Sequence, residues 1–163
     1  MASTSRRALV AELERFDRLL EVGCGDRLGV AEDLADRGRD VTAIDVADVA
    51  IDGSGGDDHV AGSTEDANTV PRGSLRVRHG DVVVLADAPD PSSSLGTSDG
   101  VDAVYARRLP AELQRPTVAL ARRLDAACLF TTLGFEEPVV PVERRSLPDT
   151  TLYVARSIAD PSP

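Results

Sequence analysis

Lysine is absent from this chain of 163 residues, and all 18 of its basic residues are arginine. Its 28 acidic residues give a formal net charge of −10 and a pI of about 4.6. This combination is typical of proteins adapted to a high-salt cytoplasm, where salt screens the repulsion between surface carboxylates. Nucleic acid is disfavoured as a partner, because affinity for phosphate backbones depends on clustered basic residues, and these arginines are scattered, mostly in pairs.

Cysteine, histidine and long apolar runs are also scarce. The two cysteines, Cys24 and Cys128, are far apart in the sequence, and we expect both thiols to be free. The two histidines and two cysteines show no spacing typical of metal ligands, so no metal site is predicted. The chain has no stretch of about 18 apolar residues and no signal-peptide core. We therefore expect a cytoplasmic protein with no membrane partner.

Two polar segments interrupt the hydrophobic pattern. Residues 47–74 and 87–100 are rich in Gly, Asp, Ser and Thr and lack a hydrophobic period, which predicts a surface insertion and a polar loop. Residues 157–163 are predicted to form a tail. The length suits a single core, since domains usually contain roughly 100–200 residues, so residues 1–163 are predicted to form one domain.

A helix followed by a strand-helix-strand unit opens the chain. Apolar residues at helical spacing predict an amphipathic helix over 4–16. A strand at 19–22, a glycine turn, a helix over 26–37 and a strand at 40–46 then follow within about 30 residues. This order predicts two parallel strands joined by a right-handed crossover.

Further strands are predicted at 101–106 and 126–131, with weaker edge strands at 139–143 and 151–155. Within 74–83, the alternation of Leu75 and Val77 with arginines predicts a short strand that leads to a turn at Gly80-Asp81. The alternation of strands and helices predicts a three-layer, Rossmann-like α/β domain. Its mostly parallel sheet should have the central strand order 3-2-1-4-5 and an added edge strand.

Two prolines lie close together after the fourth predicted strand. An interior proline costs a helix about 3 kcal/mol, so Pro110 and Pro116 are not expected inside one helix. A turn over 110–115 and a helix that begins at Pro116 are predicted instead.

Gly23 and Gly25 directly follow the first strand, in the stretch LLEVGCG. Glycines there allow a sharp turn and let a ligand approach the backbone N–H groups. Dinucleotides and S-adenosylmethionine are both bound in this way, but the dinucleotide pattern G-x-G-x-x-G requires a glycine where the chain has Leu28. Glu21 would repel a pyrophosphate, yet it can accept a hydrogen bond from the amino group of S-adenosylmethionine. The pattern favours S-adenosylmethionine and leaves NAD as the weaker alternative.

Several neighbours of this turn complete the predicted cofactor site. Asp45 lies 22 residues beyond Gly23, at the end of the second strand, where a carboxylate accepts hydrogen bonds from ribose hydroxyls. Asp81, after the third strand, is a turn residue or a further ligand contact. Cys24 and Asp26 belong to the glycine turn itself. A helix N-terminus beside Cys24 would lower the pKa of its thiol, although a simple need for a small residue is the commoner explanation.

Arg107, Arg108 and Pro110 close the fourth predicted strand, in the stretch VDAVYARRLP. Two guanidiniums at the carboxyl end of a parallel strand could bind a phosphate or carboxylate of a substrate. They cannot act as a general base, because arginine stays protonated. Equally, one arginine could pair with an acid such as Glu112 while the other is solvated. The sequence thus predicts substrate-binding residues and no catalytic residue.

The stretch LLEVGCG resembles the first motif of the class I, Rossmann-like methyltransferases, which it matches at Leu19, Leu20, Glu21, Gly23 and Gly25. Arg27 stands where that family often has a third glycine. The resemblance implies an S-adenosylmethionine cofactor. It also implies that Asp81, which lies near the position of an acidic residue in that family, faces the adenine amino group. The Asp/Asn-Pro-Pro-aromatic motif that many of these enzymes carry after the fourth strand is replaced here by the arginine pair.

From Ser5 to Tyr153 the chain also resembles a small archaeal family of Rossmann-like proteins without an assigned reaction. That family's motif, approximately Tyr-x-x-Arg-Pro-Pro-x-Glu, corresponds to Tyr105, Arg108, Leu109, Pro110 and Glu112, with Leu109 in place of the first proline. With the acidic, lysine-free composition, this resemblance indicates a halophilic archaeon as the source. Three functions stay open: an S-adenosylmethionine-binding protein or small methyltransferase, a non-catalytic binding or sensor module, and an NAD-binding protein.

Overall fold

The computed structural model describes residues 4–24, 28–46, 73–97, 100–134 and 136–155. Its helices are α1 (Thr4–Leu13), α2 (Gly29–Asp36), α3 (Val82–Asp87), α4 (Pro91–Leu95) and α5 (Ala111–Arg123). Its strands are β1 (Arg18–Val22), β2 (Asp40–Asp45), β3 (Leu75–His79), β4 (Ala103–Leu109), β5 (Ala127–Thr132), β6 (Val142–Leu147) and β7 (Thr150–Ala155). No helix in this part of the chain is long and apolar enough to cross a membrane.

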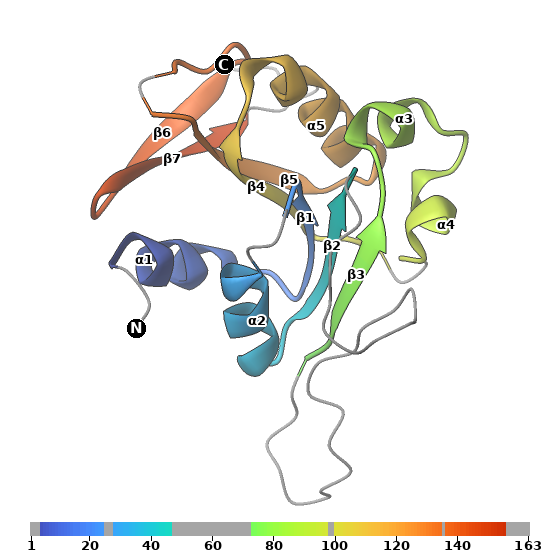
Figure 1. Cartoon of the computed structure of the whole chain (residues 1–163), viewed down its shortest axis with the longest axis horizontal. Coiled ribbons are helices and arrows are strands. Elements are labelled where there is room, and N and C mark those ends of the chain that lie inside the picture. Colours follow the sequence, from blue (N-terminus) through green and yellow to red (C-terminus); the bar gives the residue numbers. More distant parts are fainter. Residues whose placement is uncertain (1–3, 25–27, 47–72, 98–99, 135, 156–163) are drawn as a thin grey trace, which may run out of the picture.

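The strands form one seven-stranded sheet in the order β3-β2-β1-β4-β5-β7-β6 (Figure 1). The first five are parallel, and β7 then pairs antiparallel with both β5 and β6. The predicted Rossmann-like fold with central order 3-2-1-4-5 is confirmed. The predicted edge consists of a hairpin, so that β6 is the outermost strand on that side.

Helices cover both faces of the sheet, and side-chain alternation along each strand supplies the two cores. Leu19 and Leu20 of β1 are neighbours in sequence and point to opposite faces. Leu19 packs in a buried cluster with Leu34 of α2 and residues of α1. Leu20 belongs to the cluster on the other face, with Leu120 of α5 and residues of α3. Figure 1 shows these helix pairs on opposite sides of the sheet, which gives the three predicted layers.

The segments after β3 contain two helices that the sequence did not predict. The strand expected within 74–83 ends at His79, just before the predicted turn at Gly80-Asp81. Asp81 is the N-cap of α3, where its Oδ1 accepts a hydrogen bond from the Val83 N–H at 2.9 Å. Three successive valines favour a strand, but this cap and burial of the apolar face decide for a helix. The expected loop at 87–100 contains α4, capped by Asp90. Residues 47–72 and 157–163 of the predicted insertion and tail lie outside the described residues.

Helix α5 corrects the prediction of a turn over 110–115. Pro110 precedes its first residue, and Pro116 lies inside the helix. Pro116 has no N–H to donate to the carbonyl of Glu112, one turn earlier. The hydroxyl of Thr117 donates to the carbonyl of Leu113 at 2.7 Å, in parallel with the helix ladder. Burial of the face that includes Leu120 stabilises the helix enough to offset the proline.

The outer strand β6 carries three adjacent charged residues. Its Glu143 and Arg144 are exposed, and Arg145 is partly exposed. Arg144 pairs with Glu137 at 2.7 Å, and Arg145 pairs with Glu12 of α1 at 3.2 Å. The second pair ties the hairpin to the N-terminal helix.

Replacing Pro116 by alanine should stabilise the protein. The variant Pro116→Ala restores the missing N–H, and we expect a gain of about 1–2 kcal/mol in the free energy of unfolding, after the greater freedom of the unfolded chain is subtracted. Urea unfolding in molar KCl measures it. Pro110→Ala is the control, since Pro110 precedes the helix and should give no such gain. Equal effects at both positions would contradict this account of α5.

Candidate functional site at the carboxyl edge of the sheet

The glycine turn after β1 lies beside the end of β2. Gly23 has a φ of +69°, a left-handed conformation that favours glycine. Its N–H and the N–H of Cys24 both donate to the carbonyl of Ile44, at 2.9 and 3.2 Å. This double contact holds the turn next to Asp45, the last residue of β2. Gly23 and Asp45, which are predicted to contact different parts of one cofactor, therefore lie close together.

Glu21 forms a buried network with two residues of β4. Its Oε1 accepts a hydrogen bond from the Tyr105 hydroxyl at 2.6 Å, and its Oε2 pairs with Nη2 of Arg107 at 3.3 Å. The parallel register places Glu21 opposite Tyr105, and Arg107 follows two residues later on the same face of β4. The Glu21 side chain is 1% exposed, whereas that of Arg107 is 23% exposed. Both carboxylate oxygens of Glu21 thus have partners inside the protein. The contact between Glu21 and a ligand amino group stays a prediction.

Burial controls the ionisation of this network. Loss of hydration raises the pKa of Glu21 above its ordinary value of 4.5, against the lowering effects of Arg107 and Tyr105. Burial, together with the charge of Glu21, raises the pKa of the Tyr105 hydroxyl. The hydroxyl is therefore a firm hydrogen-bond donor to the carboxylate.

Cys24 is a core residue of this turn. It is buried, and loss of hydration together with the charges of Glu21 and Asp45 raises the pKa of its thiol to about 12. The expectation that a helix N-terminus lowers this pKa is wrong, and the need for a small buried residue explains the position. Cys24 and Cys128 are both free, as predicted.

A bulge at the end of β4 separates the two arginines. The register with β5 shifts between Ala106 and Leu109, and Arg108 adopts a φ of +55°. The Arg108 N–H donates to Oγ1 of Thr131 at 2.8 Å. The extra residue turns Leu109 into the same core as Ala106 and leaves Arg108 exposed.

The arginine pair thus divides its roles in a way that the sequence only half anticipated. Arg107 does pair with an acid, but the acid is the distant Glu21 and not the neighbouring Glu112. Within the described residues, the guanidinium of Arg108 has no hydrogen-bond or ion-pair partner.

The other predicted site residues are partly placed. Asp81 accepts the Val83 N–H as a helix cap, so its contact with adenine stays a prediction. Pro110 precedes α5 beside the bulge. Gly25 and Asp26 lie outside the described residues. Across the described ranges, no group of three or more His, Cys, Asp or Glu side chains is arranged to hold a metal ion.

A pocket of about 290 Å³ lies beside the Glu21 network, on the face of the sheet that α1 and α2 cover. Its lining comprises three arginines, three hydroxyl side chains, one acid and two apolar residues: Arg6, Arg107, Arg108, Ser5, Thr131, Thr150, Asp149, Leu9 and Val30. Contributions from α1 and from the β6–β7 turn were not predicted, because only the folded chain brings these distant segments to the end of β4.

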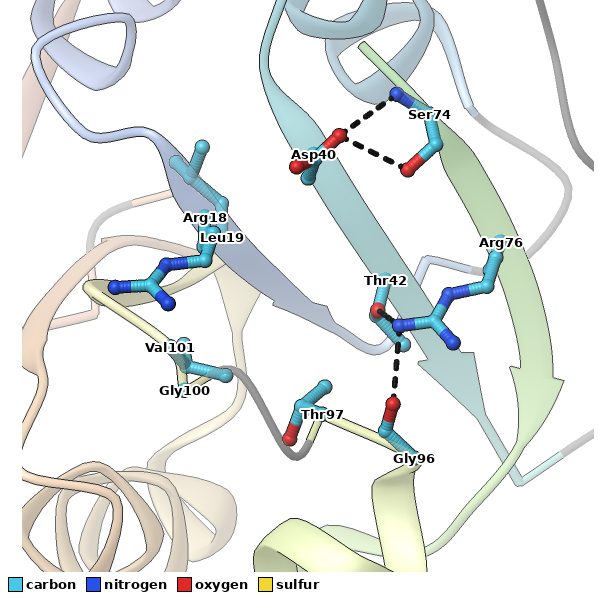
Figure 2. Close-up of a pocket in the computed structure, with 10 residues that line it drawn as sticks. All are labelled: Arg18, Leu19, Asp40, Thr42, Ser74, Arg76, Gly96, Thr97, Gly100 and Val101. Atoms are coloured by element: carbon cyan, nitrogen blue, oxygen red, sulfur yellow. Dashed lines mark hydrogen bonds between the residues drawn. The ribbon is translucent and has the colours of Figure 1, made fainter. Parts of the chain in front are cut away.

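A second hollow, of about 380 Å³, lies at the opposite, amino edge of the sheet. Figure 2 shows Arg76 of β3 between Thr42 and Gly96, and Nη2 of Arg76 donates to Oγ1 of Thr42 and to the Gly96 carbonyl, at 3.5 and 3.2 Å. Asp40 accepts hydrogen bonds from the N–H and hydroxyl of Ser74. These polar groups join neighbouring segments, whereas ligands of open α/β sheets bind at the carboxyl edge.

Comparison with known proteins places this architecture in a family. The model of the uncharacterised protein family UPF0146 matches residues 4–157. The chain belongs to this family. It is 39% identical over 154 residues to UPF0146 proteins from two strains of Halobacterium salinarum, R1 and NRC-1, with 94% of this chain and 98% of each relative covered. The predicted resemblance to this small archaeal family is confirmed, and these relatives come from a halophilic archaeon.

Solved methyltransferase structures share the fold of this UPF0146 protein. Magnesium protoporphyrin IX methyltransferase from Synechocystis PCC 6803, with bound S-adenosylmethionine, aligns with a TM-score of 0.54 and 13% identity, over 93% of this chain and 78% of that one. The same enzyme with bound S-adenosylhomocysteine gives 0.52 and 14%, over 93% and 82%. At such identity the likeness shows the fold alone, and the fold is that of class I methyltransferases.

Removing the Tyr105 hydroxyl should destabilise the protein. In Tyr105→Phe the buried carboxylate of Glu21 loses a charge-assisted hydrogen bond, and we expect a loss of about 2 kcal/mol in the free energy of unfolding. Tyr153→Phe is the matched control, because the Tyr153 hydroxyl makes no hydrogen bond within the described residues. Equal stability of the two variants would show that the Tyr105 hydroxyl contributes nothing to stability.

Glu21→Gln should change the pH dependence of stability. Because burial raises the pKa of Glu21 in the folded state, the native protein holds this proton more tightly than the unfolded chain. The parent should therefore lose stability relative to Glu21→Gln as pH rises above about 4.5. Unfolding of both proteins across pH measures the difference, with the exposed Glu112→Gln as control. A difference that grows in the parent's favour with rising pH would contradict this assignment.

Proposed function

We propose that this protein binds S-adenosylmethionine at the carboxyl edge of its sheet. The observation that carries the proposal is the contact of Gly23 and Cys24 with the Ile44 carbonyl, which holds the glycine turn beside Asp45. The methionine part of the cofactor would lie over Gly23 and Gly25, with Asp26 beside it. Asp45 would accept hydrogen bonds from the ribose hydroxyls. The class I methyltransferase fold supports this placement.

Adenine would then lie beyond β2, toward the start of α3. Asp81 keeps carboxylate acceptor capacity after it accepts the Val83 N–H through one oxygen. In this proposal Glu21 holds Arg107 through its ion pair, and its contact with the amino group of the cofactor stays a prediction. The acidic, lysine-free composition supports a high-salt cytoplasm as the environment in which the cofactor would bind.

Methyl transfer is the reaction that such a complex supports best. A bound methyl donor needs mainly alignment with its acceptor, and positioning alone can supply a large part of a rate enhancement. The arginines at the end of β4 cannot remove a proton, so the proposal names no general base.

A non-catalytic binding or sensor module is the second candidate. The observation that favours it is the arginine bulge at the position where many methyltransferases carry an Asp/Asn-Pro-Pro-aromatic motif. NAD binding is a weaker candidate function, because Leu28 stands at the third glycine position of the dinucleotide pattern and directly precedes α2.

Isothermal titration in molar KCl tests the cofactor proposal. We expect micromolar binding of S-adenosylmethionine and S-adenosylhomocysteine and no binding of NAD. Asp45→Asn should weaken both by about tenfold, the loss of one charge-assisted hydrogen-bond site. Asp36→Asn, on the exposed end of α2, removes the same charge and should leave affinity unchanged. Binding of NAD alone, or of none of the three, would overturn the proposal.

Turnover distinguishes the two remaining functions. Formation of S-adenosylhomocysteine in the presence of small anionic acceptors indicates a methyltransferase. Tight binding of S-adenosylmethionine without any conversion indicates a binding module.

A further inference from the structure

We propose that the pocket beside the Glu21 network binds the oxyanion of a small ligand, a phosphate or carboxylate group, with Arg108 as its main cation. The pocket adjoins the cofactor edge, so its role as the substrate site rests on the proposed function. The anion site itself stands on the observations that follow.

The charges around the pocket leave Arg108 available. Nε of Arg6 pairs with Asp33 at 2.9 Å, and its Nη2 donates to the Gly29 carbonyl at 3.0 Å. Arg107 is paired with Glu21, as described above. Arg108 makes no ion pair within the described residues, although its pocket also contains Asp149. Arg108 is therefore a cation in the pocket lining for which the described residues supply no ion-pair partner.

Thr131 provides a second donor at the same place. It is 8% exposed, and its Oγ1 accepts the Arg108 N–H at 2.8 Å. A hydroxyl that accepts one hydrogen bond still has its own hydrogen to donate. Within the described part of the chain this hydrogen has no acceptor. A buried donor that lines the same pocket as an unpaired guanidinium is well suited to a ligand oxygen that carries negative charge.

The backbone at Arg108 also indicates a function for its side chain. Its φ of +55° is unfavourable for any residue except glycine and its few tolerant substitutes. Residues in such conformations concentrate at ligand-binding sites, where the surrounding structure holds them. Here the β4 bulge and the Thr131 contact hold the strained residue and leave its side chain at the pocket.

The size of the pocket sets the class of ligand. About 290 Å³ is at the lower end of the usual range for small-molecule sites, which excludes a large polymer within it. The apolar side chains of Leu9 and Val30 form part of the lining, so the ligand should have a small apolar part besides its anionic group. A compact organic phosphate or carboxylate meets these requirements.

Anion titrations at constant ionic strength test the proposal. Potassium phosphate, followed by ³¹P line broadening, and ¹³C-labelled acetate, followed by ¹³C line broadening, replace KCl in separate series and distinguish the two chemistries. We expect Arg108→Gln to weaken binding of the preferred anion by about tenfold, the effect of losing one charge-assisted contact. Arg7→Gln is the matched control, since Arg7 is exposed on α1 next to Arg6 and does not line the pocket.

A third variant separates binding from folding. Arg108→Gly relieves the left-handed backbone, so it should melt at a higher temperature than Arg108→Gln and yet bind the anion equally weakly. The proposal is overturned if the parent binds neither anion, or if Arg108→Gln binds as tightly as Arg7→Gln.

Titration of the same variants with S-adenosylhomocysteine keeps the two proposals distinguishable. Unchanged cofactor affinity in Arg108→Gln with loss of anion binding supports separate subsites. Anion binding that depends on Arg108, without any cofactor binding, overturns the proposed function and leaves the anion site in place.

Discussion

The carboxylate of Glu21 is the group on which the functional edge of this protein depends. A charged group that is 1% exposed is strongly unfavourable unless hydrogen bonds and an opposite charge replace its water. Both replacements come from β4, as the Tyr105 hydroxyl and the Arg107 guanidinium. Two central strands are thereby fixed in register at their carboxyl ends, beside the glycine turn. Together with burial, the same carboxylate raises the pKa of the Cys24 thiol, which favours its protonated form.

This network also determines what the arginine pair can do. Arg107 is held by Glu21 and has a structural position, while the bulge turns the next residue away from the sheet. Without the bulge, Leu109 would follow Arg107 on the same face, because side chains alternate along a strand. One extra residue therefore returns the chain to the core and presents Arg108 at the pocket. The fold thus gives two identical side chains different roles: Arg107 pairs with Glu21, and Arg108 lines the pocket.

The central fold was predictable from the sequence because its signals are local. The apolar run before Gly23 and the acid at Asp45 define the first parallel pair, and chirality and connection rules then order the remaining strands. Asp81 shows a limit of local reasoning: its capping role was visible as a turn residue, but the valines after it resemble a strand. Pro116 shows another limit, since tertiary burial of α5 outweighed a strong local preference.

The candidate site was predictable only in its strand-end residues. Gly23, Asp45 and Arg108 lie where parallel strands must end, and sequence order alone brings them to one edge. Arg6 and Thr150 lie near opposite ends of the chain, and their approach depends on how α1 and the hairpin pack. The partner of Arg107 was likewise hidden, because nothing in the sequence pairs residue 21 with residue 107 before β1 and β4 are known to be neighbours.

The charged outer strand has a consequence for how copies of this protein coexist at high concentration. In molar salt the Debye length is about 3 Å, so a net charge of −10 no longer keeps molecules apart over a distance. Among the described residues β6 is the last strand of the sheet on its side, and such an edge strand can pair with the edge of another copy. To pair there, a second strand would have to displace the water and acidic partners around Arg144 and Arg145. Removing water from these charged side chains is a cost at short range, and it opposes edge-to-edge pairing even where long-range repulsion is screened.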